Sequence, residues 1–80
     1  MKALVIEDEA LAARHIQSVL AEIGTIQVLS IQDSIASTVE WFGENSQPDL
    51  IFMDIHLADG SAFKIFELIN ITCPIIFTTA

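Results

Sequence analysis

Short apolar runs alternate with longer amphipathic stretches along this chain. The runs predict β-strands at residues 2–7, 26–31, 49–53 and 74–79. Three of them contain continuous blocks of large or small apolar residues, which is typical of strands buried on both faces of a parallel sheet. Polar residues interrupt the run at 26–31, so this strand is expected at an edge of the sheet.

Between these runs, apolar positions recur at helical spacing. The spacing predicts helices at residues 9–23, 34–45 and 61–70. Asp8 is a candidate N-cap for the first helix, and Gly24 is a natural C-terminal stop.

Local residues also suggest how the second and third helices are arranged. Asp33 or Ser34 is expected to cap the second helix, because a short polar side chain can accept a hydrogen bond from the first helical turn. In the third helix, Phe63, Phe66 and Ile69 are expected to face inward.

The predicted elements follow one another in the order βαβαβαβ. Strict alternation of strands and helices favours an α/β fold, with a doubly wound parallel sheet, right-handed crossovers and helices on both faces. No linker or repeat divides the chain, so its 80 residues are expected to form a single small folding unit.

Composition narrows the possible functions. The chain is 52% hydrophobic, which excludes a disordered acidic segment, and its net charge is −8. The basic residues are too few to neutralise a nucleic-acid backbone, since the chain has only Lys2, Arg14 and Lys64, and an anionic membrane would repel the chain.

No apolar stretch approaches the ~20 residues of a spanning helix, so a cytoplasmic protein is expected. Cys73 is the only cysteine, which excludes an intrachain disulfide and a cysteine metal cluster.

Polar residues follow three of the predicted strands. Glu7 and Asp8 end the first strand, Asp54 follows the third, and Thr79 ends the fourth. In parallel sheets of this kind, ligands bind at the carboxyl ends of the strands. If the first and third strands are neighbours, the three carboxylates converge, and their repulsion is unfavourable unless protonation or a cation relieves it.

Magnesium fits this set best, because it prefers oxygen ligands and keeps several waters. Asp8 and Asp54 are short enough to bind the ion directly, Glu7 can act through a water, and the backbone carbonyl of His56 is a further candidate ligand. Asp54 is also a candidate nucleophile that would form an aspartyl phosphate. Thr79 can offer its hydroxyl to a phosphoryl oxygen.

Each of these residues also has a purely structural interpretation. Asp8 can serve as a helix cap, a threonine at a strand end is usually structural, and Asp59-Gly60 is most simply a turn. The conjunction of acids and a hydroxyl at three strand ends favours the functional interpretation.

Three segments resemble the receiver domains of two-component response regulators. They are residues 4–9 (Leu-Val-Ile-Glu-Asp-Glu), residues 49–57 with Asp59-Gly60, and residues 74–80 (Pro-Ile-Ile-Phe-Thr-Thr-Ala). The resemblance implies that Asp54 is the phosphoacceptor and that a histidine kinase is the phosphodonor. It also implies that Glu7 and Asp8 serve Mg²⁺, and that Thr79 is the switch hydroxyl.

The resemblance further implies a flavodoxin-like sheet with strand order 2-1-3-4, in which residues 1–80 are the N-terminal part of a receiver domain. The family's fourth helix, fifth strand and fifth helix have no counterpart here. Neither does its phosphate-contacting lysine, since Lys64 matches the third helix. The chain is therefore expected to be a signalling module rather than an enzyme, with self-catalysed phosphotransfer in the intact domain only.

Two stretches, residues 7–14 and 54–61, look most like regulators of the LytTR group. Members of that group carry a DNA-binding domain after the receiver, which implies an output in transcription. Any contact with DNA is then expected through a C-terminal domain outside these residues.

Two alternatives belong to other classes of protein. The first is a non-phosphorylated interaction fragment. Without a fifth strand, residues 75–77 form an apolar sheet edge, so the chain is expected to self-associate through that edge or through the uncovered sheet face.

An aspartyl-phosphate phosphatase of the haloacid-dehalogenase type is the other alternative. Those enzymes use a second Asp two positions after the nucleophile, where this chain has His56.

Overall fold

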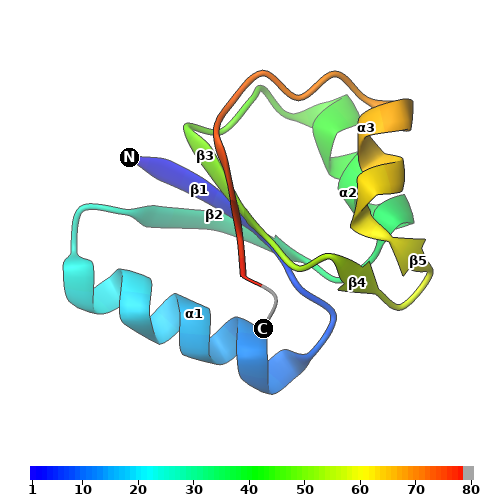
Figure 1. The fold of residues 1–80 in the computed structure, drawn as a ribbon. Coiled ribbons are helices and arrows are strands. Elements are labelled where there is room, and N and C mark those ends of the chain that lie inside the picture. Colours follow the sequence, from blue (N-terminus) through cyan, green and yellow to red (C-terminus); the bar gives the residue numbers. More distant parts are fainter. Residues whose placement is uncertain (79–80) are drawn as a thin grey trace.

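A four-stranded parallel sheet forms the centre of the molecule (Figure 1). The computed structural model describes residues 1–78. The strand order is β2-β1-β3-β6, and the strands are β1 (Lys2–Ile6), β2 (Gln27–Gln32), β3 (Leu50–Met53) and β6 (Ile75–Phe77). This is the predicted order 2-1-3-4, with the polar second strand at an edge. The predicted α/β fold is thus confirmed.

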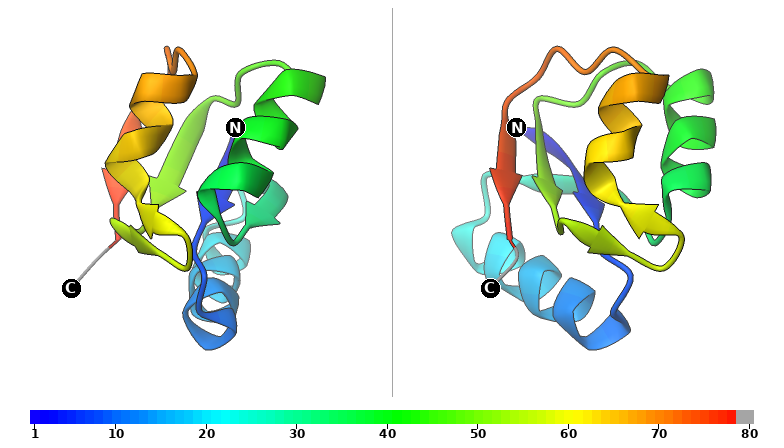
Figure 2. Two further views of the ribbon diagram at one scale, coloured as in Figure 1. Left: turned by 90° about the vertical axis from the view of Figure 1, so that its right-hand side faces the viewer. Right: turned by 45° about the vertical axis from the view of Figure 1, so that its right-hand side comes forward.

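The helices cover both faces of this sheet. Helix α1 (Ala10–Ile23) lies on one face, and α2 (Ile35–Glu44) and α3 (Ile65–Leu68) lie on the other (Figures 1 and 2). The main core forms on the α2 and α3 side, where alternate residues of β1 and β3 point. Its buried members are Leu4, Ile6, Ile35, Ile51, Met53, Leu57, Ala62 and Ile65.

Helix α1 begins one residue later than predicted. Glu9, with extended backbone angles of φ −85° and ψ 120°, is the N-cap residue, and its carbonyl accepts a hydrogen bond from Ala13 N at 3.0 Å. The prediction that Asp8 caps this helix is therefore wrong. The predicted stop at Gly24 is confirmed, because Gly24 has φ +78°, a value that glycine adopts readily, and donates its N–H to Leu20 O.

The third predicted helix is shorter than expected, and a different set of its side chains faces the core. It starts as a 3₁₀ turn (Ala62–Lys64) that leads into α3, after a small hairpin of β4 (His56–Leu57) and β5 (Gly60–Ser61) that the sequence did not predict. Ala62 N donates to Ile55 O at 2.7 Å, which holds Ala62 inside the core.

The start of this helix decides which side chains face inward. Residues three apart share a face in a 3₁₀ turn, so Ile65 follows Ala62 into the core. The prediction that Phe63 and Phe66 face inward is therefore wrong: they are 51% and 39% exposed. Ile69 packs against the core as predicted.

Strand β6 forms one edge of the sheet within residues 1–78. Ile76 and Phe77 are 48% and 44% exposed there. Ile76 also lines an open apolar groove of about 200 Å³ beside α1, together with His15, Ile16, Val19, Leu20, Phe52 and Thr78. The predicted apolar edge is present in the described part of the chain.

Among the helices formed by residues 1–78, none has the length and apolar character needed to span a membrane.

Candidate functional site

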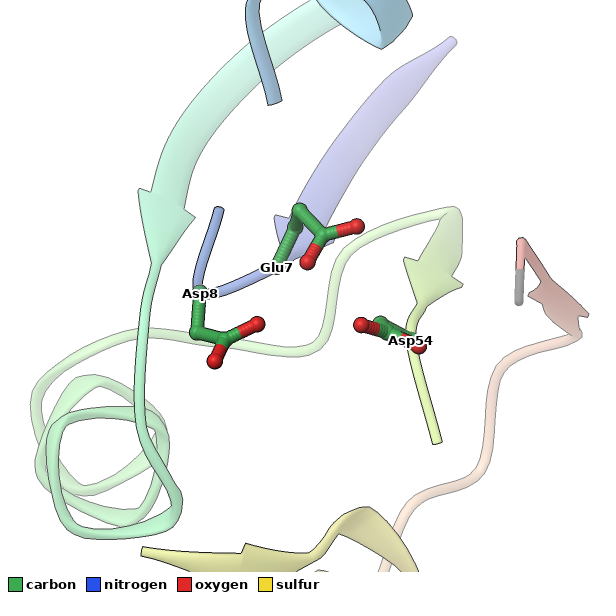
Figure 3. Close-up of side chains that lie close together, drawn as sticks. All are labelled: Glu7, Asp8 and Asp54. Atoms are coloured by element: carbon green, nitrogen blue, oxygen red, sulfur yellow. The ribbon is translucent and has the colours of Figure 1, made fainter. Parts of the chain in front are cut away.

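Three carboxylates lie together at the carboxyl edge of the sheet (Figure 3). Glu7 and Asp8 directly follow β1, and Asp54 directly follows β3. The two strands are neighbours, with Ile6 paired to Met53. One carboxylate oxygen from each of the three acids lies within 4.8 Å of the other two. Residues almost fifty positions apart thus meet at one site, as their positions at strand ends led us to expect.

Backbone hydrogen bonds hold the main chain in place at two of these acids, Glu7 and Asp54. Asp54 N donates to Ile6 O at 2.9 Å, and Glu7 N donates to Gln32 O at 2.9 Å. The ladders between neighbouring strands therefore continue one residue beyond each strand. Because the main chain is held on both sides, the carboxylates start from a rigid base.

Glu7 is the buried member of the cluster, with 7% of its surface exposed. Burial is the largest of the effects that raise its pKa from 4.5 to about 7. The neighbouring carboxylates of Asp54 and Asp8 raise this pKa further. A hydrogen bond from Glu9 N to Glu7 Oε2, at 3.2 Å, lowers the pKa and so opposes the rise. The cluster thus resists carrying three negative charges at neutral pH.

A hard divalent cation fits this donor set. The three side chains offer only carboxylate oxygens, which are the ligands that Mg²⁺ prefers. Asp8 is exposed and Asp54 half-buried, so the site is open to water on one side, and an ion there can keep part of its hydration shell. Added positive charge would also offset the repulsion that raises the pKa of Glu7.

His56 and Thr79 are the remaining predicted site residues. His56 is exposed, and its N–H lies 3.4 Å from Asp54 Oδ1. Thr79 lies outside the described residues. The chain leading to it stays beside β3, because Thr78 N donates to Met53 O at 2.9 Å.

Asp59 has a role that the sequence did not reveal. It lies in the turn between β4 and β5, as the Asp-Gly pair predicts, but its carboxylate accepts hydrogen bonds from Ile35 N at 2.8 Å and Ala36 N at 3.1 Å. The Ile35 bond is the largest cause that lowers the pKa of Asp59. The turn was visible in the sequence, whereas its partner, more than twenty residues earlier, was not.

The chain is similar to several curated bacterial regulators. It is 33% identical over 67 residues to the sensory transduction protein LytT of Enterococcus faecalis, covering 84% of this chain and 27% of the relative. It is 34% identical, over an alignment 83 residues long, to the transcriptional regulatory protein LytR of Staphylococcus aureus. This alignment covers all of this chain and 33% of the relative. The chain thus spans about a third or less of the length of these relatives. No protein-family model matches the sequence.

Solved structures of response regulators share the fold. The response regulator PhyR from Brucella abortus superposes with a TM-score of 0.81 and 29% identity, over 95% of this chain and 32% of that one. The MaeR response regulator bound to beryllium trifluoride gives a TM-score of 0.82 over 100% of this chain and 67% of that one, and at 24% identity it supports the fold alone. With its LytT and LytR homologues, its receiver-type sheet order and its acids at the ends of β1 and β3, this chain is homologous to response regulators of two-component systems and has the fold of their receiver domains.

Proposed function

We propose that Asp54 accepts a phosphoryl group from a histidine kinase, in a Mg²⁺-dependent transfer that switches an output. The observation that carries this proposal is the convergence of Glu7, Asp8 and Asp54 from the ends of two neighbouring strands. Homology to response regulators supports the kinase as the donor, since those proteins work in two-component signalling.

In the proposed transfer, a carboxylate oxygen of Asp54 attacks the phosphorus atom of a phosphohistidine. The new P–O bond replaces the P–N bond, and the kinase imidazole leaves with a proton in place of the phosphoryl group. Glu7, Asp8, Asp54 and the His56 carbonyl are the residues that would hold the metal. Bound Mg²⁺ would supply charge neutralisation between the carboxylate and the phosphoryl oxygens.

The position of Asp54 suits it to this step. Its backbone is fixed by the bond to Ile6 O, and the carboxylate is half-buried rather than enclosed, so a donor can reach it. Thr79 follows β6 in sequence and is the proposed switch hydroxyl.

We further propose that residues 1–80 are the N-terminal part of a receiver domain in a longer cytoplasmic regulator. The greater length of the LytT and LytR relatives supports this. The name of LytR, a transcriptional regulatory protein, supports an output in transcription through a separate DNA-binding domain.

Labelling with acetyl phosphate tests the assignment of Asp54 in the full-length regulator. Asp54→Asn is expected to abolish Mg²⁺-dependent labelling, because an amide cannot form the acyl phosphate. Glu67→Gln is the matched control, since it removes one exposed carboxylate from α3 and should leave labelling unchanged. Full labelling of Asp54→Asn would assign the phosphate to another residue.

A second candidate function, as a self-associating interaction module, is favoured by the edge strand. Ile76 and Phe77 are exposed on β6, and the Phe77 ring lies 5.7 Å from that of Phe63, which is exposed as well. An apolar, unpaired strand edge is a template for pairing with another chain.

Sedimentation of this chain tests self-association. Ile76→Lys should shift any oligomer to monomer, because a charge on an edge strand opposes pairing. Leu11→Lys, which replaces another exposed apolar residue on α1, should not. A wild-type chain that stays monomeric at high concentration would reject this candidate.

A further inference from the structure

The first turn of α2 receives its hydrogen-bond acceptors from two different parts of the chain. Ser34 supplies one pair: its Oγ accepts from Ser37 N at 3.0 Å, and its carbonyl accepts from Thr38 N at 3.1 Å. The first two N–H groups, those of Ile35 and Ala36, donate instead to the carboxylate of Asp59. Asp59 thereby completes the cap that the local sequence leaves half made.

The hairpin that carries Asp59 is also packed against the same helix end. Leu57 of β4 is buried in the main core. Gly60 has φ +136°, and a Cβ placed on it would lie 3.4 Å from Ile35 Cδ1. The hairpin therefore approaches the first residue of α2 closely, through a backbone conformation that glycine tolerates best.

The same hairpin begins within the candidate metal site. Asp54 directly follows β3. His56, whose carbonyl is a proposed ligand, is the first residue of β4 and pairs with Ser61. Asp54 is held at one end of this segment by its bond to Ile6 O, and Asp59 is held at the other end by α2. The candidate ligands at 54 and 56 thus lie on a short stretch anchored at both ends.

We propose that Asp59 is a positioning residue for the metal site: by binding the start of α2, its carboxylate orders the segment that presents Asp54 and the His56 carbonyl. This inference rests on the proposed function, because it takes Asp54 and His56 as ligands. The lowered pKa of Asp59 is consistent with a carboxylate that accepts two N–H groups. The Asp59 carboxylate is hydrogen-bonded to Ile35 N and Ala36 N, and Asp59 is not a member of the acid cluster, so its proposed action on the metal site is indirect.

Calorimetric titration of this 80-residue chain with Mg²⁺ alone, beside amide hydrogen exchange, tests the inference. Asp59→Asn is expected to weaken Mg²⁺ binding about tenfold, as loss of a group that orients metal ligands typically does. The amides of Ile35, Ala36 and Leu57 should exchange faster in the same variant, while circular dichroism shows that the fold is kept.

Two controls separate positioning from simpler effects. Asp33→Asn removes an exposed charge from the same end of α2, and it should change Mg²⁺ affinity less than twofold. Ser34→Ala removes the local half of the cap and destabilises the helix by a comparable amount, yet it should leave Mg²⁺ affinity and exchange at Leu57 unchanged.

The outcomes distinguish failure of this inference from failure of the proposed function. The inference is overturned if Asp59→Asn binds Mg²⁺ as tightly as Asp33→Asn does. It is also overturned if Asp59→Asn and Ser34→Ala lose the same amount of Mg²⁺ affinity, because Asp59 would then act only as a helix cap. Wild-type binding that persists in Asp54→Asn, or no wild-type binding, would overturn the proposed metal site instead. In that case, amide hydrogen exchange at Leu57 still decides whether Asp59 orders the segment. Faster exchange in Asp59→Asn than in Ser34→Ala would support this ordering, and equal rates would overturn it.

Discussion

Replacing Glu7 with Gln should make the folded chain more stable at pH 8 and leave it unchanged near pH 4.5. Glu7 is buried between other acids, and its pKa is raised to about 7 in the folded protein. The folded state therefore holds the Glu7 proton more tightly than the unfolded state does. The resulting stabilisation is fully present below pH 4.5 and is lost as the pH rises through 7. Gln mimics the protonated form at every pH and still offers an oxygen to Glu9 N.

The size of the effect follows from the two pKa values. A rise from 4.5 to about 7 corresponds to roughly 3 kcal/mol between the two protonation states. A domain of this length typically has a total stability of about 4–12 kcal/mol, so the loss is a large fraction of the whole. The expected difference in melting temperature between wild type and Glu7→Gln is on the order of 10–20 °C at pH 8.

Urea denaturation in metal-free buffer from pH 4.5 to pH 8 measures this difference directly. Comparison with Glu7→Gln cancels the titration of groups common to both proteins. Mg²⁺ added at pH 8 should recover part of the lost wild-type stability, because a ligand that binds only the folded state stabilises it. Parallel stability curves for the two proteins over this pH range would refute the reasoning that burial and neighbouring carboxylates control Glu7.

Three further predictions concern packing and reactivity. Ile65→Ala should cost about 2–5 kcal/mol in urea denaturation because Ile65 is fully buried, whereas Phe63→Ala, at a half-exposed position, should cost clearly less; equal losses would contradict the helix phase described here. Gly60→Ala should destabilise the chain by about 1–3 kcal/mol in the same assay, since φ is +136° there, and a neutral result would argue against that backbone conformation. Burial raises the pKa of the Cys73 thiol, so alkylation by iodoacetamide should increase only at more alkaline pH than for a free thiol, and a midpoint at or below 9 would be the contrary result.

Much of the fold was predictable because its signals are local. Apolar blocks placed all four strands of the main sheet within a residue or two, and helical spacing placed α1 and α2. The alternation of strands and helices then implied a parallel sheet. The third helix was placed less well, because the β4–β5 hairpin before it sets its phase through a bond between Ala62 N and Ile55 O.

The candidate site divides in the same way. The sequence by itself determined that Glu7, Asp8 and Asp54 stand at strand ends, because strand boundaries are encoded in the spacing of apolar residues. The resemblance to receiver domains had implied that β1 and β3 are neighbours, as they are. Only the tertiary structure decided that Glu7 is buried and that Asp59 binds α2. Each of these depends on contacts between segments distant in sequence. Residue spacing carries no direct record of such contacts, because they form only when the helices and hairpin pack on the sheet.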